Sequence, residues 1–321
     1  MENLAILIPC YNEEKTIEKV VNDCKSATRN IKNTTIYVYD NNSTDRTVEL
    51  AKKAGAVVRY QYKQGKGNVI RKMFHEIEAK CYIMIDGDDT YPTEDIPKMA
   101  EYILKQDYDM VVGDRLSSSY FDENKRPFHG IGNKLVRGSI NFFFKTDIRD
   151  IMTGYRAFSY NFVKTYPVLS HGFEIETEMS IFATVNNLSV KNHVIEYRDR
   201  PEGSNSKLNT FSDGFKVLRL IFTLYRNYKP LNFYGALALL LMILAIGVFV
   251  PNVWIPYEAT GKVLNMPTLV VCGFCFIAGI ISFYSGLMLD STQRKERREY
   301  EFRLQEAEWN KNLTAYSFDT M

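Results

Sequence analysis

Over roughly the first 230 residues, short apolar runs rich in β-branched and aromatic residues alternate with longer segments that repeat apolar residues at helical spacing. The short runs are predicted strands, at residues 4–9, 35–39, 56–60, 82–85 and 110–112. The longer segments, such as 65–79 and 93–106, are predicted helices. This alternation favours an α/β fold with a mostly parallel sheet. In such a sheet, the loops after the strands meet at one edge, where ligands bind.

The pattern changes after residue 230. Residues 231–257 and 266–289 carry no charged side chain. A helix of about 18 residues is roughly 27 Å long, close to the thickness of the hydrocarbon core of a bilayer. An uncharged helix of this length with no polar stripe would be unusual in the core of a small domain. Both segments are therefore predicted to span a membrane.

Basic residues flank this pair of apolar segments on the outer sides. They are Lys216, Arg219, Arg226 and Lys229 before the first segment, and Arg294, Lys295, Arg297 and Arg298 after the second. The connecting loop carries only Glu258 and Lys262. The positive-inside rule therefore predicts a protein of the cell membrane with both termini in the cytoplasm and a short external loop. The first residues do not have the pattern of a signal peptide.

The segment before the first span has its own pattern. Its apolar stripe at helical spacing consists of Phe215, Leu218, Ile221, Phe222 and Tyr225. Next to a membrane span, the stripe favours an interfacial helix over an ordinary core helix. The expected organisation is a catalytic domain over 1–208, an interfacial helix region over 209–230, two spans over 231–290 and a cytoplasmic tail over 291–321. The tail could join subunits, so a homo-oligomer stays open.

The charge balance argues against one class of partner. The 321 residues include 40 Lys and Arg against 38 Asp and Glu, for a net charge of +2. Nucleic-acid binding through a strongly basic surface is therefore not expected. The five cysteines show no spacing typical of a metal site.

Polar side chains follow three of the predicted strands, at residues 9–13, 40–45 and 86–89. Carboxylates from three loops on one sheet edge would repel one another unless a cation or sugar hydroxyls lay between them. The last loop, Asp86-Gly87-Asp88-Asp89, offers two acids at i and i+2. Mg²⁺ and Mn²⁺ prefer such oxygen ligands and commonly bridge them to phosphate. A solvated acidic turn is the alternative, and the neighbouring loops make it the weaker interpretation.

Six motifs occur in a fixed order along the chain: PCYNEE, YDNNSTDRT, GKGN, MIDGDDTYP, TGYRAF and RPEGSNSKL. Together they resemble family 2 glycosyltransferases, in particular polyprenyl-phosphate hexosyltransferases. That group includes dolichyl-phosphate mannose synthases and bacterial undecaprenyl-phosphate glucosyltransferases. The resemblance covers about residues 4–225 and implies a GT-A fold, a nucleotide-sugar donor and a divalent cation, Mg²⁺ or Mn²⁺.

The resemblance assigns residues to the donor side. Those expected at the donor nucleotide are Pro9, Tyr11, Glu13, Asp40, Lys66 and Asp86. Asp86 and Asp88 match the pair that holds the metal in relatives. Asn41 and Thr90 stand where relatives often carry an acid and a glutamine. The glycine loop around Lys66 could approach a phosphate, although a plain helix-start turn explains its glycines equally well.

The acceptor side is assigned in the same way. The residues expected to contact the lipid phosphate or the diphosphate are Arg198, Arg200, Ser204, Ser206 and Lys207. Arg115 and Arg156 are further expected phosphate ligands, since guanidinium groups pair well with phosphate oxygens. Asp150 is expected to orient the sugar or the acceptor, with a role as general base as the weaker alternative. For the 198–207 stretch, an ordinary charged surface loop stays open.

The expected reaction moves a hexose from a nucleotide sugar, preferably UDP-glucose, to the phosphate of a polyprenyl-phosphate lipid, with inversion. UDP-N-acetylglucosamine and GDP-mannose stay open as donors. A processive polysaccharide synthase is a rival, but such enzymes carry a QxxRW motif, and neither Trp254 nor Trp309 lies in one. A non-enzymatic membrane scaffold would be expected to lose the acidic pair or the basic stretch.

Overall fold

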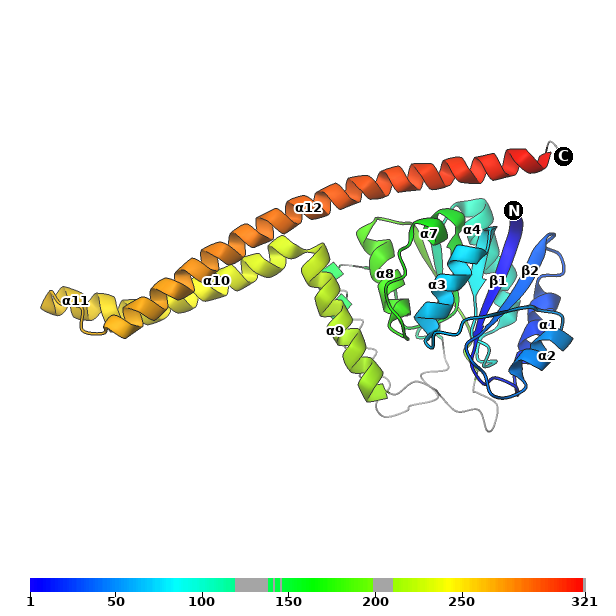
Figure 1. Cartoon of the computed structure of the whole chain (residues 1–321), viewed down its shortest axis with the longest axis horizontal. Coiled ribbons are helices and arrows are strands. Elements are labelled where there is room, and N and C mark those ends of the chain that lie inside the picture. Colours follow the sequence, from blue (N-terminus) through cyan, green and yellow to red (C-terminus); the bar gives the residue numbers. More distant parts are fainter. Residues whose placement is uncertain (119–137, 141, 145, 199–209, 320–321) are drawn as a thin grey trace. The chain divides into compact units, whose positions relative to one another are not determined.

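The structure is a computed structural model that describes residues 1–118, 138–140, 142–144, 146–198 and 210–319 (Figure 1). The chain divides into two compact units. The first comprises residues 1–221 and 301–321 and contains the sheet, and the second comprises residues 222–300.

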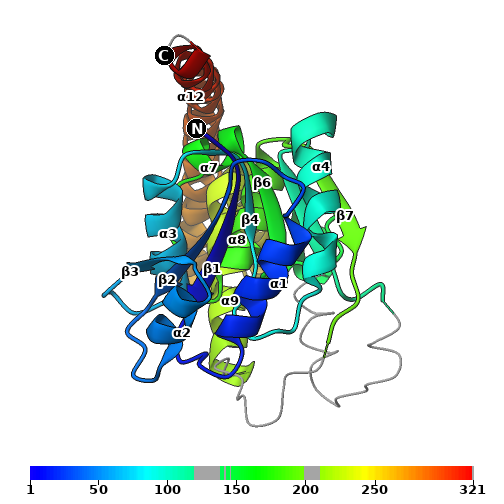
Figure 2. The same cartoon turned by 90° about the vertical axis from the view of Figure 1, so that its right-hand side faces the viewer.

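A seven-stranded sheet forms the centre of the first unit, in the order β3-β2-β1-β4-β6-β5-β7 (Figure 2). The strands are β1 (Glu2–Cys10), β2 (Thr34–Asp40), β3 (Val57–Tyr60), β4 (Ala79–Met84), β5 (Met110–Asp114), β6 (Arg156–Ser159) and β7 (Val190–Val194). All neighbouring pairs are parallel except those of β6, which is antiparallel to β4 and β5. The predicted α/β fold with a mostly parallel sheet is confirmed.

One face of the sheet is covered by α1 (Ile17–Ala27), α2 (Thr47–Lys53) and α4 (Ile96–Gln106), the last entered through the 3₁₀ turn η1 (Thr93–Asp95). The helices contribute an aliphatic layer in which Val21, Ala51 and Met99 pack with Ile6 and Ile8 of β1. The apolar residues of α4 recur at helical spacing, and a left-handed Asp107 ends the helix. The packing of these helices on the sheet therefore follows directly from the spacing of apolar residues in the sequence.

The opposite face is covered by α3 (Lys66–Glu76), α7 (Tyr160–Thr165) and α8 (Ile175–Val185). It is lined with aromatic rings: Phe74 of α3 lies 5.6 Å from Phe158 of β6, which stacks at 4.8 Å on Phe162 of α7. Phe162 meets Phe182 of α8 at 5.7 Å. Side chains of β1 are buried on both faces, as in the centre of a parallel sheet.

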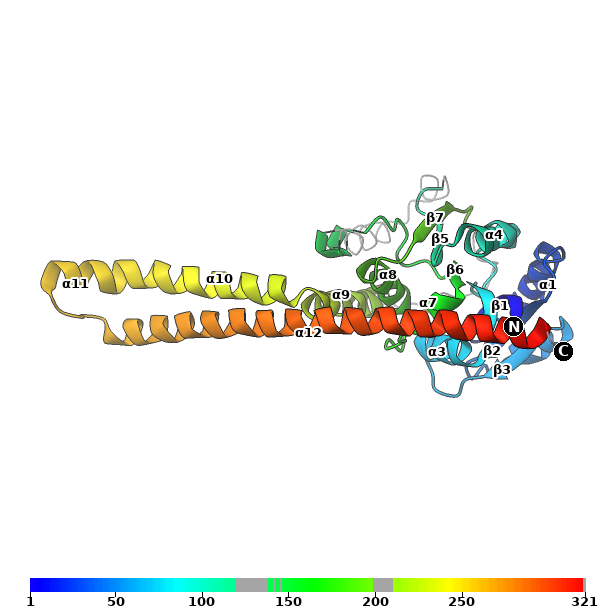
Figure 3. The same ribbon diagram turned by 90° about the horizontal axis from the view of Figure 1, so that it is seen from above.

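The second unit contains a pair of long apolar helices. The helices from residue 210 onward are α9 (Thr210–Tyr228), α10 (Pro230–Phe249), η2 (Val250–Trp254, a π-helix), α11 (Ile255–Thr260) and α12 (Met266–Asp319). Helix α10 and the first part of α12 run side by side in opposite directions (Figure 3). They approach closely at Gly279, where an added Cβ would lie 3.1 Å from Met242, and at Gly286, where it would lie 3.0 Å from Tyr234.

The helical segments 230–260 and 266–313 are both long and apolar enough to cross a membrane. Most side chains of their apolar stretches are exposed, including Leu239, Leu244, Phe274 and Ile281. Such an exposed apolar surface is stable in contact with the hydrocarbon of a bilayer and unfavourable in contact with water. The positions of both apolar segments agree with the sequence prediction. The predicted domain boundaries and the orientation of the termini stay predictions.

Candidate active site

The loops after β1, β2 and β4 meet at one edge of the sheet because these strands are adjacent and parallel. The backbone N–H of Asn12 donates to Ser43 Oγ at 2.9 Å, and the Asn12 side-chain oxygen accepts from the N–H of Thr44 at 2.8 Å. Thr16 Oγ1 donates to the carbonyl of Gly87 at 2.6 Å. The three polar loops predicted from the sequence are thus connected by hydrogen bonds.

The residues assigned to the nucleoside lie on the first two of these loops. Tyr11 is 38% exposed, and Pro9 and Glu13 are half-buried at the end of β1. Asp40 is buried, and its two carboxylate oxygens accept from the backbone N–H of Ser43 at 3.3 and 3.2 Å. These four side chains come from adjacent strand ends, so they lie on the same part of the sheet edge.

Asn41 is buried and holds the glycine loop in place. Its Nδ2 donates to the carbonyls of Gln61 at 2.6 Å and Lys63 at 3.1 Å, and its Oδ1 accepts from the N–H of Gly65 at 2.8 Å. A carboxylate could accept from Gly65 but could not donate to the two carbonyls. The asparagine at this position is therefore explained by loop structure.

The two acids of the DGDD turn differ in environment. Asp88 is buried, and its Oδ1 accepts from the Thr90 hydroxyl at 2.6 Å. Asp86 is partly exposed, and its Oδ1 pairs with Lys66 Nζ at 2.7 Å. Asp89 has a left-handed backbone and forms an ion pair with Lys19 of α1 at 2.7 Å. The extra acid is thus directed toward α1 and away from the other two.

Lys66 lies between two carboxylates. Besides Asp86 it contacts Glu176 Oε1 of α8, also at 2.7 Å. Burial alone would lower the pKa of the Lys66 ammonium, but the two carboxylates raise this pKa above its usual value, so the group is charged. Glu176 was missed by the sequence analysis. It is separated from the DGDD turn by about 90 residues, and an acid in an apolar helix has no motif of its own.

The glycines beside Lys66 are required by close packing of protein backbone. An added Cβ at Gly65 would lie 2.2 Å from the carbonyl oxygen of His171, and one at Gly67 would lie 2.1 Å from that of Ser170. Gly67 N–H donates to the His171 carbonyl at 3.0 Å. The loop is therefore packed against residues 170–171. The structure favours the helix-start interpretation of the glycines over an open phosphate cradle.

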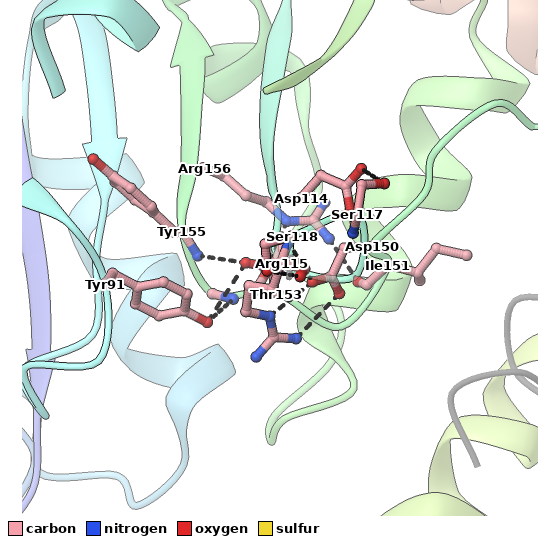
Figure 4. A network of polar contacts seen from close by, with 11 residues as sticks. Tyr91, Asp114, Arg115, Ser117, Ser118, Asp150, Ile151, Thr153, Tyr155 and Arg156 are labelled. Atoms are coloured by element: carbon pink, nitrogen blue, oxygen red, sulfur yellow. Dashed lines mark hydrogen bonds and ion pairs between the residues drawn. The ribbon is translucent and has the colours of Figure 1, made fainter. Parts of the chain in front are cut away.

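Arg115 and Asp150 form a buried bidentate pair (Figure 4). Arg115 Nε donates to Asp150 Oδ2 at 2.7 Å and its terminal nitrogen to Oδ1 at 3.1 Å. Asp150 is 1% exposed, and its negative charge holds the pKa of Arg115 well above the usual value despite burial. Because both oxygens of Asp150 accept from a permanent cation, this carboxylate is poorly suited to act as a base. The geometry shows that Asp150 fixes Arg115, and its expected role in orienting the sugar or the acceptor stays a prediction.

Arg156 does not have the surroundings that a phosphate ligand would need. It is completely buried on β6, where its guanidinium donates to the carbonyls of Ile151 at 2.6 Å and Thr153 at 3.1 Å (Figure 4). It also donates to the hydroxyl of Ser180 at 2.9 Å. Burial lowers the pKa of Arg156 to about 10. The expected phosphate contact is corrected: Arg156 fixes the 151–153 segment beneath the site.

Tyr91 and Gly154 connect the DGDD turn to this segment, and neither was predicted from the sequence as a site residue. Gly154 N–H donates to the Tyr91 hydroxyl oxygen at 3.0 Å. An added Cβ at Gly154 would lie 2.5 Å from Asp86 Oδ2. The TGYR motif thus brings a bare backbone against the carboxylate of Asp86.

The basic stretch begins beside the DGDD turn. The backbone N–H of Arg198 donates to the carbonyl of Thr90 at 2.9 Å, and its guanidinium pairs with Glu94. The preceding ring, Tyr197, lies 5.6 Å from Tyr91 and 5.3 Å from the Arg115 guanidinium. The remaining residues assigned to phosphate, Arg200, Ser204, Ser206 and Lys207, lie outside the described residues.

A metal at this site would be held mainly by oxygen. Asp86, Asp88 and the Thr90 hydroxyl offer the hard oxygen donors that Mg²⁺ and Mn²⁺ prefer. Within the described part of the chain, no group of three or more His, Cys, Asp or Glu side chains is arranged to hold a metal ion. The donor set therefore fits a cation that takes its other ligands from phosphate and water.

Comparison with known proteins identifies the family. Residues 5–166 match the model of glycosyl transferase family 2. The chain belongs to this family. It is 30% identical to "Glycosyltransferase AglJ" of Haloferax volcanii over 303 residues, which cover 93% of this chain and 97% of that protein. It is 28% identical over 222 residues to a "Dolichyl-phosphate hexose transferase" of the same organism, covering 67% and 91% of the two chains.

A shorter relative and a solved structure extend the comparison. The family 2 chain is 51% identical to "Protein RfbJ" of Shigella flexneri over 113 residues, 35% of this chain and 85% of that protein. The crystal structure of glucosyl-3-phosphoglycerate synthase from Mycobacterium tuberculosis, in complex with Mn²⁺, UDP and its product, superposes with a TM-score of 0.54. It covers 70% of this chain and 80% of that one at 18% identity, and it shows the shared GT-A fold.

Proposed function

We propose that this glycosyltransferase moves a hexose from a nucleotide sugar to the phosphate of a polyprenyl-phosphate lipid. The observation that carries the proposal is the hydrogen bond between Arg198 N–H and the Thr90 carbonyl. It places the backbone of Arg198 against Thr90, two residues after Asp88, which supports a single site for the acidic pair and the basic stretch that starts at Arg198. Relatives named as dolichyl-phosphate transferases support a lipid-phosphate acceptor.

On the donor side, the nucleoside lies over the strand ends that carry Tyr11, Glu13 and Asp40, with Pro9 at the base of the same loop. Lys66 and Asp86 lie nearest the diphosphate. UDP-glucose is the preferred donor, since a structural neighbour of the same fold binds UDP with Mn²⁺. UDP-N-acetylglucosamine and GDP-mannose are the alternatives that a donor screen distinguishes.

Asp86 and Asp88 hold a divalent cation, Mg²⁺ or Mn²⁺, which neutralises the diphosphate leaving group when bound. Thr90 orients Asp88 by donating to one of its oxygens, and Lys66 pairs with one oxygen of Asp86. The Thr90 contact fixes Asp88 before the donor arrives, which reduces the cost of organising the site.

The acceptor needs little activation. A phosphate monoester is largely ionised at pH 7, because its second pKa is about 6. The protein therefore has to hold the phosphate in line with the anomeric carbon, and the product is inverted. Arg115, fixed by Asp150, and the basic stretch from Arg198 to Lys207 supply the positive charge. Asp150 acts on Arg115 as a positioning residue.

The membrane segments bring the site to its lipid. Helices α10 and α12 span the bilayer, with the catalytic domain and both termini in the cytoplasm. Helix α9 lies at the membrane surface through Phe215 and Phe222, which are 70% and 53% exposed, whereas Ile221 of the predicted apolar stripe is buried.

The test is a donor and acceptor screen. Purified full-length protein with Mn²⁺ or Mg²⁺ should move labelled sugar from one nucleotide sugar into a polyprenyl phosphate. Removal of the cation with a chelator should stop transfer. Donor hydrolysis without any lipid product, or extension of a soluble polysaccharide instead, would contradict the proposed acceptor.

A further inference from the structure

Lys66 occupies an unusual position for a residue beside an acidic pair. Its ammonium lies 2.7 Å from Asp86 and 2.7 Å from Glu176, and its side chain is only 10% exposed. The two carboxylates differ in access to solvent: the side chain of Glu176 is 4% exposed and that of Asp86 is 26% exposed. Lys66 is thus shared between an inner acid from α8 and an outer acid from the DGDD turn.

The outer acid is also the one that the proposed function assigns to a divalent cation. The ammonium already takes Asp86 Oδ1. The other oxygen faces the backbone of Gly154, where even a Cβ would lie at 2.5 Å. A second cation at Asp86 would therefore be close to the Lys66 charge, and like charges at this separation repel strongly in a partly buried site.

Lys66 is not free to leave for solvent. Glu176 is buried and pairs with Lys66 at 2.7 Å, so departure of the ammonium would leave a buried carboxylate without this compensating charge, which is strongly unfavourable. Lys66 is the first residue of α3, and its loop is packed against residues 170–171, which keeps its backbone fixed. The movement open to the ammonium is a small one, from Asp86 toward Glu176.

We propose that Lys66 and the divalent cation compete for Asp86, and that Glu176 retains the Lys66 ammonium when the cation binds. This inference rests on the proposed function, because it takes Asp86 as a metal ligand. Without donor and cation, Lys66 neutralises Asp86 and keeps the acidic turn compact. With them, Glu176 keeps Lys66 as a fixed positive charge beside the diphosphate. Glu176 is a positioning residue in this account.

The inference predicts opposite effects for two substitutions on binding of Mn²⁺ alone. Lys66→Met removes the competing charge, so affinity for Mn²⁺ without nucleotide should rise about tenfold or more. Glu176→Gln removes the acid that draws Lys66 away from Asp86, so affinity should fall about tenfold. Affinity for UDP in the presence of Mn²⁺ should fall in both variants, since Lys66 is lost or misplaced.

Glu78→Gln is the matched control. Glu78 pairs with Lys164 at 2.6 Å, but it precedes β4, at the opposite end of the strand from the DGDD turn. The same chemical change there removes a Lys–Glu pair without touching the site. Affinity for Mn²⁺ should equal that of the wild type.

The measurement is a Mn²⁺ titration of the full-length protein in detergent, followed by electron paramagnetic resonance of free Mn²⁺, with and without UDP. Damage to the fold would weaken binding in both variants, so tighter binding by Lys66→Met cannot arise from misfolding. Wild-type binding that is lost in Asp88→Asn but unchanged or weaker in Lys66→Met would overturn this inference and leave the proposed function standing. Wild-type protein that binds no Mn²⁺ would overturn the inference together with the metal assignment, and sugar transfer is assayed separately.

Discussion

Asp86 is the residue at which the parts of the candidate site meet. Its carboxylate contacts Lys66 from the glycine loop and lies against Gly154 from the TGYR segment. Gly154 in turn donates to Tyr91, which follows the DGDD turn. The carboxylate of Asp86 and the backbone of Gly154 therefore hold together three segments that are distant in sequence.

Gly154→Ala tests this arrangement at the residue scale. The new methyl group would overlap Asp86 Oδ2, and neither the strand-end backbone nor the carboxylate can yield freely. We expect Mn²⁺ binding and sugar transfer to fall by about tenfold or more, and overpacking to destabilise the fold by about 1–3 kcal/mol. Gly235→Ala, where an added Cβ meets nothing within 4 Å, is the control. Equal activity of the two variants would show that Asp86 tolerates the added group.

Asp150→Asn tests the buried pair. The substitution leaves the Arg115 guanidinium without its carboxylate in a site that is largely closed to solvent. Removing one partner of such a pair should lower the free energy of unfolding by about 3–5 kcal/mol. Because Asp150 positions Arg115, transfer should fall while its pH profile keeps its shape. Loss of the acidic limb, the fall in rate at low pH that protonation of a general base causes, would identify Asp150 as a general base instead.

For single residues, the sequence predicts what a side chain can do chemically better than it predicts which other residues the side chain contacts. It placed Asp86 and Asp88 at the edge of the sheet because they directly follow a buried strand. It assigned Arg156 to phosphate, because a motif does not reveal that β6 directs this side chain into the core. It did not predict Glu176, because its contact with Lys66 depends on the packing of α8 near α3.

At the scale of elements, the glycine loop depends on Asn41. Asn41→Asp keeps the size of the side chain but replaces two N–H donors with acceptors, so the carbonyls of Gln61 and Lys63 lose their partner. We expect the free energy of unfolding to fall by roughly 1–3 kcal/mol for each buried group left unsatisfied. Chemical denaturation measures this effect. The control is Asn42→Asp, which removes an exposed bond from the Asn42 amide to the Tyr62 carbonyl of the same loop, and an equal loss there would show that burial gives the Asn41 contacts no added weight.

Strands could be predicted where a short apolar run in the sequence determines them. The five strands expected up to residue 112 are all present, since each is a short apolar run next to a turn. The antiparallel strand β6 and the edge strand β7 were not predicted. Their runs, Arg156–Ser159 and Val190–Val194, are short and partly polar, and they become strands because β4 and β5 supply hydrogen-bonding partners.

For the whole molecule, the two apolar helices and their basic flanks predict on which side of the membrane the connecting loop and the C-terminal tail lie. A cysteine at Thr260, in the short connection, should react with an impermeant thiol reagent added to intact cells. A cysteine at Glu301, on the exposed surface of α12, should react only after the cells are opened. The basic flanks account for this orientation. Labelling at Glu301 in intact cells would place the candidate site on the wrong side for a cytoplasmic nucleotide sugar.

The central claim is that the DGDD turn catalyses transfer of a sugar to a lipid phosphate, and one measurement tests it most directly. Transfer of radiolabelled sugar from nucleotide sugar to polyprenyl phosphate is compared among wild type, Asp88→Asn and Asp89→Asn. Asp89 is the matched control, because it pairs with Lys19. The account predicts a loss of at least about 100-fold for Asp88→Asn and near-normal transfer for Asp89→Asn. Near-normal transfer by Asp88→Asn, or no lipid product from the wild type with any donor, would contradict it.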